Sequence, residues 1–97
     1  MADRPFNVLF LCTHNSARSL MAEAILRERG GNRFVAHSAG VTPKAAPDPL
    51  TLETLRLARV PADGLRPKSR DVFREVPLDF VFTVCNELSG EACPPWE

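Results

Sequence analysis

A cysteine and an arginine six positions apart, Cys12 and Arg18, are the side chains of this sequence best suited to chemistry. An apolar run from Phe6 to Leu11 precedes them, and apolar residues at helical spacing follow from Leu20 onward. A strand that passes through a short polar loop into a helix directs backbone N–H groups and the positive end of the helix dipole at one point. We therefore expect an oxyanion-binding loop with Cys12 at its mouth.

The residue types of this loop fit that interpretation. The N–H groups and the arginine favour the thiolate of Cys12, which is the nucleophilic form of cysteine. Arg18 can contact two oxygens of a bound anion at once, which lysine cannot do. Asn15 tolerates the left-handed conformation of tight loops, and the hydroxyls of Ser16 and Ser19 can donate to the loop or to the thiolate. The expected anion-binding residues are Thr13, His14, Asn15, Ser16, Ala17, Arg18 and Ser19.

A simpler interpretation remains open for the same residues. Free cysteine is often only a small buried hydrophobic side chain, so Cys12 could end a buried strand while Arg18 faces solvent. The same alternative applies to Cys85, at the end of an apolar run, and to Cys93 beside Pro94.

The composition indicates one small domain covering residues 1–97. Twelve Lys and Arg balance twelve Asp and Glu, which gives no reason to expect nucleic acid or an acidic membrane surface as a partner. No apolar run is long enough for a membrane span, and the first five residues lack the apolar core of a signal peptide. We therefore expect a cytoplasmic protein. Three cysteines, an odd number, do not form a disulfide scaffold and indicate redox or nucleophilic chemistry.

The elements that must position the loop alternate between strand and helix. We expect a helix over about 17–29, with Glu23 and Arg27 paired on its solvent face, and a strand over 34–38. A second helix begins at Pro49 with Asp48 as N-cap and runs to about 59, one helical turn lies near 69–74, and a third strand covers 80–84.

This alternation requires a parallel sheet with right-handed crossovers and helices on its faces, which is an α/β fold. Ligands of such sheets bind beyond the carboxyl ends of the strands. Cys12 follows the first strand and Cys85 follows the third, so the two sulfurs are candidates to meet at that edge.

With these residues in view, the chain resembles the arsenate reductases that share the fold of the low-molecular-weight protein tyrosine phosphatases. Three stretches carry the resemblance, and it covers the whole chain: VLFLCTHNSARSLMAEAIL at 8–26, HSAGV at 37–41 and DFVFTVCNELSGEACPPW at 79–96. The resemblance implies a three-layer arrangement with a parallel sheet of strand order two, one, three.

The resemblance also implies site residues and a reaction. In the family the loop cysteine attacks arsenate, a second thiol attacks that cysteine and releases arsenite, and a third cysteine moves the disulfide outward. Thioredoxin, or a glutaredoxin with glutathione, then reduces the protein. By position, the nucleophile is Cys12, the anion-binding arginine is Arg18, the loop-shaping residue is Asn15, the hydroxyl that steadies the thiolate is Ser19, and the resolving pair is Cys85 and Cys93.

We expect no tightly bound cofactor and no metal site, because the sequence has no Cys-x-x-Cys motif and no histidine pair at metal-ligand spacing. We expect His14 to lie near the anion and His37 to be a hydrogen-bonded strand residue. Some members of the family bind potassium, and the corresponding residues here are weak candidates: Asn15, Glu23, Ser38 and Asp63.

The sequence departs from the family pattern after the CPPW segment. Family members continue into a fourth strand, a loop with an Asp general acid and a last helix, whereas this sequence ends at Glu97, with Glu87 and Glu91 as the only substitutes for the acid. We expect either a fragment or a truncated relative with impaired chemistry. Without the fourth strand, residues 80–84 form an exposed edge through which the chain could self-associate.

Three functions therefore stay open. The leading one is arsenate reduction by Cys12, Cys85 and Cys93. A phosphotyrosine phosphatase would need Cys12, Arg18 and an acid but neither of the other cysteines. An oxyanion-binding or redox module with impaired catalysis is the third.

Overall fold

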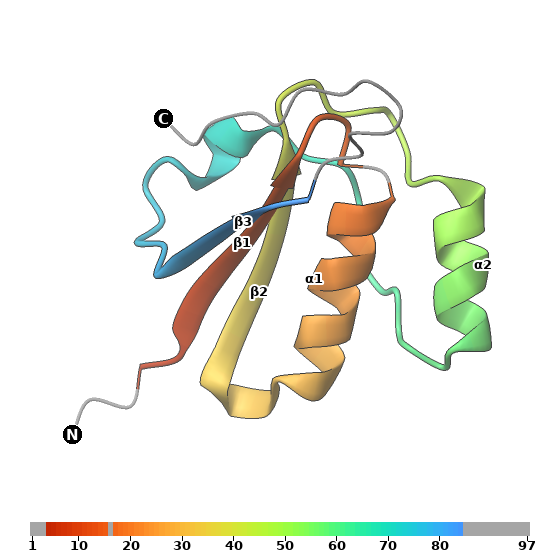
Figure 1. The fold of residues 1–97 in the computed structure, drawn as a ribbon, viewed down its shortest axis with the longest axis horizontal. Helices are drawn as coiled ribbons and strands as arrows, with labels where there is room; N and C mark the ends of the chain where they lie inside the picture. The colour runs from red at the N-terminus through yellow and green to blue at the C-terminus, as the bar shows by residue number, and fades with distance from the viewer. Residues whose placement is uncertain (1–3, 16, 85–97) are drawn as a thin grey trace.

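The computed structural model describes residues 4–15 and 17–84, in which three strands form one parallel sheet. The strands are β1 (Phe6–Cys12), β2 (Phe34–Gly40) and β3 (Phe80–Thr83), in the order β2-β1-β3. Helices α1 (Arg18–Arg29) and α2 (Pro49–Leu57) lie together on one side of the sheet (Figure 1). Two short 3-10 helices complete the fold, η1 (Gly31–Arg33) and η2 (Arg70–Phe73). The predicted α/β fold and its strand order are confirmed.

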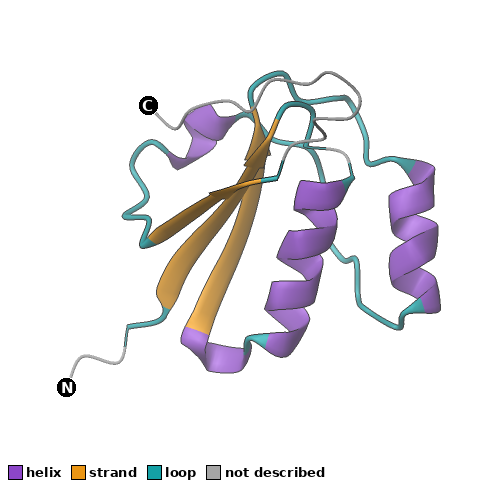
Figure 2. Ribbon diagram, in the orientation of Figure 1, coloured by secondary structure: helices purple, strands orange, loops and turns teal. Residues whose placement is uncertain are grey.

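The sheet has an apolar core on each side, because successive side chains of a strand point to opposite faces. On one side, Leu9, Leu11 and Ala39 pack against Phe73 of η2. On the other side, α1 covers β1 and β2, and its Leu20 and Ala24 form a second core with residues from α2 and the segment after it. Figure 2 shows η2 separated from the two longer helices by the sheet. This packing holds the C-terminal end of β1 directly beside the start of α1.

Helix α2 begins as its sequence predicts. The Asp48 side chain accepts a hydrogen bond of 2.9 Å from the Leu50 N–H, with Pro49 at the first helical position. The helix ends at Leu57, two residues before the expected end, and Arg59 has a φ of 61°, a left-handed conformation that stops helical continuation. Strand β2 extends two residues beyond the expected 38, because its pairing with β1 continues to Cys12 opposite Gly40.

Glu23 and Arg27 form the expected ion pair, but the expectation that this pair faces solvent is wrong for Glu23. Glu23 is 8% exposed, because α1 packs on the sheet through this face and brings the carboxylate to Ser38 of β2. Arg27 lies 4.0 Å from the far oxygen of Glu23 and remains exposed. Spacing along a helix identifies which side chains are neighbours on its surface, but it does not say which side faces the sheet.

Strand β3 pairs only with β1 among the described residues and leaves part of its surface uncovered. Phe80 is 44% exposed and Phe82 is 50% exposed, although an apolar strand of this kind is typical of the middle of a sheet. Their rings lie within a row of phenylalanines that we call the aromatic face: Phe34, Phe6, Phe80, Phe82 and Phe10.

None of the helices within 4–15 and 17–84 is long and apolar enough to cross a membrane. The predictions for Ser16, Cys85, Cys93, Glu87 and Glu91 lie outside the described residues.

Candidate active site

The loop between β1 and α1 closes around the sulfur of Cys12. The sulfur accepts a hydrogen bond of 3.0 Å from the Asn15 N–H and lies 2.9 Å from the hydroxyl of Ser19. That hydroxyl already accepts a bond of 2.7 Å from the Asn15 side-chain amide, so its own proton can be donated to the sulfur. Two donors therefore face Cys12, an arrangement suited to a negatively charged sulfur.

Asn15 shapes this loop through both its backbone and its side chain. Its φ is 50°, which confirms the expected left-handed conformation, and its side chain is fully buried. The side-chain oxygen accepts a hydrogen bond of 2.8 Å from the Lys68 N–H. Because a backbone N–H can only donate, this contact fixes the amide orientation and leaves the NH₂ group to donate to Ser19.

The chain after β2 runs beside the loop and supports it from one side. Each of three successive contacts joins a backbone N–H of this segment to a carbonyl of the loop: Val41 to Cys12 at 3.2 Å, Thr42 to Thr13 at 2.8 Å and Lys44 to His14 at 3.0 Å. Gly40, the last residue of β2, lies close beneath the loop. The loop is thus part of a continuous hydrogen-bonded layer rather than a free connection.

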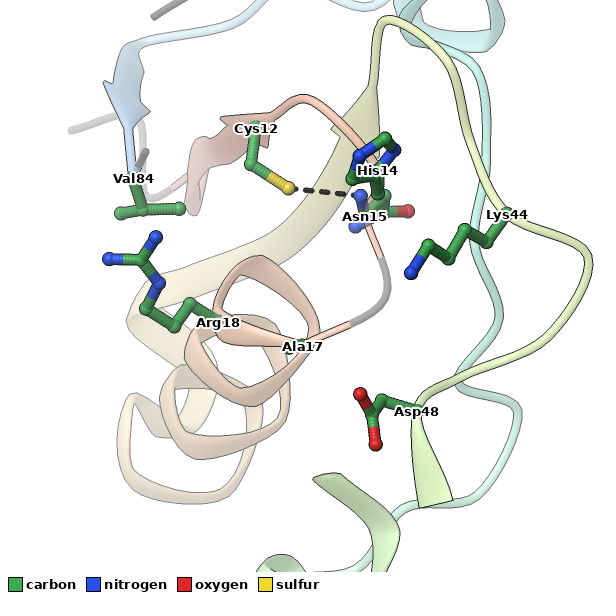
Figure 3. A pocket seen from close by; sticks show the side chains of 8 residues that line it. All are labelled: Cys12, His14, Asn15, Ala17, Arg18, Lys44, Asp48 and Val84. Atoms are coloured by element: carbon green, nitrogen blue, oxygen red, sulfur yellow. Dashed lines mark hydrogen bonds between the residues drawn. The ribbon is translucent and has the colours of Figure 1, made fainter. Parts of the chain in front are cut away.

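A pocket of about 180 Å³ opens above the Cys12 sulfur. Figure 3 shows the side chains around it, which come from the loop, the start of α1, the segment after β2 and the end of β3. Its lining residues are Cys12, His14, Asn15, Ala17, Arg18, Lys44, Asp48 and Val84. The volume is enough for several water molecules, and hence for a small tetrahedral oxyanion.

The charges around the pocket favour an anion. Arg18 and Lys44 both line it and are exposed to solvent, and in Figure 3 they approach from different sides. Arg18 is also the first residue of α1, whose N-cap, Ala17, offers no side-chain acceptor to the first N–H groups. These groups and the helix dipole add a positive field at the pocket. Asp48 is the acidic residue among those that line it.

The sequence prediction identified part of this site. His14, Asn15, Ala17 and Arg18 line the pocket with Cys12, whereas Ser19 lies behind the sulfur. Thr13 contributes its backbone carbonyl to the pairing with Thr42. Three lining residues were not predicted, Lys44, Asp48 and Val84. Only Asp48 carried a sequence signal, and that signal indicated a helix cap.

The two histidines lie as expected. His14 lines the pocket, and its Nδ1 is 3.3 Å from the Thr42 carbonyl. His37 points to the other side of the sheet, where its Nε2 lies 3.0 Å from the Asn7 side-chain oxygen and its ring contacts Phe73. Burial lowers the pKa of His37, and the opposing attraction of Glu23 is weaker.

The structure brings two of the four potassium candidates, Glu23 and Ser38, into contact. Asp63 is exposed and, among the described residues, makes no hydrogen bond or ion pair with Asn15, Glu23 or Ser38. The ammonium group of Lys68 lies beside Glu23 and Ser38 instead, at 3.4 and 3.5 Å. Within 4–15 and 17–84, no three His, Cys, Asp or Glu side chains are grouped to hold a metal ion.

A parallel sheet whose first strand leads through a cysteine loop into an arginine-bearing helix defines a class of proteins that bind oxyanions beside a cysteine nucleophile. Residues 7–96 match the family of the low molecular weight phosphotyrosine protein phosphatases, and the chain belongs to this family. No curated protein sequence gives a significant match.

Solved structures of two kinds of enzyme are similar to this chain. A thioredoxin-dependent arsenate reductase of Corynebacterium glutamicum is 35% identical, with a TM-score of 0.78 over 99% of this chain and 47% of that one. An arsenate reductase of Archaeoglobus fulgidus is 32% identical, with a TM-score of 0.77 over 93% of this chain and 68% of that one.

A low molecular weight protein tyrosine phosphatase of T. tengcongensis is 30% identical, with a TM-score of 0.69 over 80% of this chain and 57% of that one. This chain therefore spans about half the length of the C. glutamicum and T. tengcongensis enzymes.

Proposed function

We propose that this chain carries the oxyanion-binding and nucleophilic part of a thiol-dependent arsenate reductase, with Cys12 as nucleophile and Cys85 and Cys93 as resolving cysteines. The observation that carries the proposal is the position of Val84. Val84 lines the same pocket as Cys12, and its N–H donates a hydrogen bond of 2.9 Å to the Leu11 carbonyl at the end of β1. Cys85 is the next residue in the sequence. The similarity to two arsenate reductases supports the same assignment.

The proposed reaction uses two thiols as the source of two electrons. The Cys12 thiolate attacks arsenate held by Arg18 and the loop N–H groups, a sulfur–arsenic bond forms, and one arsenate oxygen leaves as water. The Cys85 thiolate then attacks the Cys12 sulfur. The electron pair of the sulfur–arsenic bond passes to arsenic, which leaves as arsenite, and a Cys12–Cys85 disulfide remains.

The third cysteine prepares the protein for reduction. The Cys93 thiolate attacks Cys85, frees Cys12 and forms a Cys85–Cys93 disulfide that an external dithiol can reduce. We propose thioredoxin as the reductant, as for the C. glutamicum enzyme, with a glutaredoxin and glutathione as the alternative. These reductants operate in the cytoplasm, where we expect the protein to act.

A tyrosine phosphatase is the alternative function. The family description and the T. tengcongensis phosphatase favour it. Arsenate and phosphate have similar charge and shape, so the same loop would bind either anion. The two reactions differ after the first step, because a phosphatase lets water hydrolyse the Cys12 adduct while a reductase supplies a second thiol. A module that binds the oxyanion without turnover is the third possibility.

Counting thiols separates these functions. The reduced protein is offered arsenate or an aryl phosphate, and free thiols, arsenite and released phosphate are measured. We expect arsenate to consume two thiols per chain and to yield one arsenite. Cys12→Ser should abolish thiol loss and arsenite formation, Cys85→Ser should abolish arsenite formation, and Cys93→Ser should allow one turnover but slow reduction by thioredoxin.

Other outcomes assign the other functions. Phosphate release without thiol loss would support the phosphatase, and anion binding without either product would support the binding module. Brief alkylation at mildly acidic pH followed by peptide mapping tests the nucleophile separately, and faster labelling of Cys85 or Cys93 than of Cys12 would contradict its assignment.

A further inference from the structure

Lys44 brings a second positive side chain to the pocket above Cys12, on a segment that the loop holds in place. The Lys44 N–H donates the last of the three hydrogen bonds between this segment and the loop, at 3.0 Å to the His14 carbonyl. This contact fixes the Lys44 backbone beside the loop, although the residue is exposed to solvent. In Figure 3 its ammonium group points into the pocket from the side opposite Arg18. The two cations therefore face a bound anion from two directions.

The ammonium group of Lys44 is not engaged elsewhere in the part of the chain that the structure describes. Within residues 4–15 and 17–84, its nitrogen makes no ion pair and no hydrogen bond. Asp48, the acidic residue of the pocket, uses one carboxylate oxygen to accept a backbone N–H at 2.9 Å and cap α2. Lys44 thus differs from Arg56, which is paired with a carboxylate on its own helix. An unpaired ammonium group beside a pocket is free to contact a ligand.

The charge balance of the pocket indicates why a second cation matters. A Cys12 thiolate and a doubly charged oxyanion bring three negative charges together, and the carboxylate of Asp48 adds another at the pocket wall. Arg18 supplies one positive charge, and the N-terminus of α1 supplies the equivalent of about half a charge. Lys44 raises this opposing charge from about 1.5 to about 2.5. Because Coulomb energy is proportional to the product of the charges, Lys44 attracts a doubly charged anion about twice as strongly as a singly charged one.

We propose that Lys44 contacts the bound oxyanion and is a specificity-determining residue, which makes this pocket favour doubly charged tetrahedral anions over singly charged ones. The favoured class includes hydrogen arsenate, hydrogen phosphate and phosphate monoesters, whereas phosphate diesters belong to the disfavoured class. This inference deepens the proposed function, because it rests on the oxyanion site proposed there. It holds for a reductase and for a phosphatase, since both begin with a bound oxyanion.

The test compares sulfate with perchlorate, which are both tetrahedral but carry two charges and one charge at neutral pH. Each anion is titrated against alkylation of Cys12 by iodoacetamide, a neutral reagent, and peptide mapping follows the labelling. The concentration that halves the labelling rate measures affinity. Ionic strength is kept low and constant, because salt screens exposed charges. The natural sequence should bind sulfate more tightly than perchlorate.

Lys44→Gln removes the charge, retains a side chain of similar length and leaves the backbone hydrogen bond to His14 in place. We expect perchlorate affinity to fall about threefold, in the range of exposed ion pairs, and sulfate affinity to fall about tenfold, because doubling the charge squares the factor. Lys44→Arg should retain the preference for sulfate. Arg29→Gln removes an exposed cation at the other end of α1 and should change neither affinity. All three variants should melt at the temperature of the natural sequence, since both side chains are exposed.

Asp48→Asn separates contact with the anion from simple neutralisation of Asp48. This substitution removes the carboxylate charge and retains a side chain that caps helices equally well. If Lys44 contacts the anion, Lys44→Gln should still lower sulfate affinity about tenfold in the Asp48→Asn background. If the effect disappears there, Lys44 acts only by offsetting Asp48, and the proposal is overturned.

Other results would also overturn the proposal. One is a Lys44→Gln protein that loses sulfate and perchlorate affinity by the same factor, or that loses neither. Equal losses together with a lower Tm would assign position 44 a structural role instead. Another is a natural sequence in which sulfate gives no protection of Cys12. Absence of arsenate turnover alongside the expected sulfate and perchlorate results would contradict the proposed reductase and leave this inference unchanged.

Discussion

The oxyanion-binding loop and the aromatic face belong to the same sheet but are built in opposite ways. At the loop, polar side chains are buried, and Asn15, Ser19 and Ser38 are all fully inaccessible to solvent. On the aromatic face, apolar side chains are exposed, with Phe80 and Phe82 each about half accessible. Among the described residues, no buried side-chain nitrogen or oxygen lacks a hydrogen-bond partner.

The loop is held by contacts from several segments of the chain, whereas β3 pairs only with β1 among the described residues. Among residues 4–15 and 17–84, contacts that shape the anion site come from the loop, the first turn of α1, the segment after β2 and the segment around Lys68. Phe80 and Phe82, the part of the aromatic face on β3, are exposed because α1 packs on β1 and β2 rather than on β3. Substitutions of the exposed side chains of β3 can therefore change the surface of the sheet without touching the loop around Cys12.

Breaking the loop at Asn15 should have the largest effect on stability. Asn15→Ala places an alanine at a φ of 50°, which costs about 1–2 kcal/mol, and it leaves the Lys68 N–H without its acceptor, at about 1–3 kcal/mol more. We expect the free energy of unfolding to fall by about 3 kcal/mol in urea titrations. Asn32→Ala, at an exposed position of η1, should change it little. Equal effects of the two substitutions would contradict the importance of the loop network.

Arg18→Lys should weaken anion binding without changing the stability of the fold. A single ammonium cannot contact two oxygens as a guanidinium does, so we expect phosphate affinity to fall about tenfold by calorimetry. The melting temperature should stay the same, since Arg18 is exposed. Arg29→Lys, at the other end of α1, serves as the control. An unchanged affinity for Arg18→Lys would exclude bidentate contact.

Phe82→Lys tests the aromatic face. We predict that the 97-residue chain self-associates through β3, where Phe82 stacks on Phe10 at 5.9 Å while half of its surface stays exposed. A lysine there should weaken association by about 1 kcal/mol, or about fivefold, as measured by light scattering over a range of protein concentrations. Val72→Lys replaces another exposed apolar side chain, in η2, and should have no such effect. A natural sequence that is monomeric at all concentrations would show the prediction to be wrong.

The smallest expected effect concerns the contacts of Asp79 with Arg4 and Asn7, a clasp that joins the start of β1 to the start of β3. Asp79 accepts two hydrogen bonds from the Arg4 guanidinium, at 2.8 and 3.0 Å, and one from the Asn7 N–H at 2.7 Å. The hydrogen bonds from Arg4 hold the pKa of Asp79 below its ordinary value of 3.8. The clasp therefore stabilises the fold at pH values above 3.8, and this contribution disappears as the pH falls through the lowered pKa.

Asp79→Asn provides the measurement for this pH dependence. The natural sequence should melt at a higher temperature than the variant at pH 7, and the difference should shrink below pH 4. A difference in Tm that is constant from pH 7 to pH 2 would mean that the charge of Asp79 plays no part in the clasp.

The parts of the molecule that local patterns determine were predictable from sequence. The strand, loop and helix around Cys12, the left-handed Asn15 and the Asp48 cap each depend on residues within a few positions of one another. The Lys68 contact with Glu23 joins residues 45 positions apart, and no periodicity marks either of them as buried. Lys44 likewise reaches the pocket only because the segment after β2 pairs with the loop. The missed contacts are therefore those that the topology creates between distant segments.

The closeness of Gly40 to the loop limits how this sequence can vary. A Cβ at position 40 would lie 2.8 Å from the Thr13 carbonyl oxygen, closer than real Cβ atoms approach such an atom, and 3.0 Å from the Asn15 Cβ, a tight contact. In a library containing every substitution, position 40 should tolerate replacement as poorly as position 12, the proposed nucleophile, although Gly40 does not line the pocket. Selection for anion binding would therefore retain Gly40 only because a larger residue would collide with the loop. A second substitution could restore binding only if it changed the conformation of the loop.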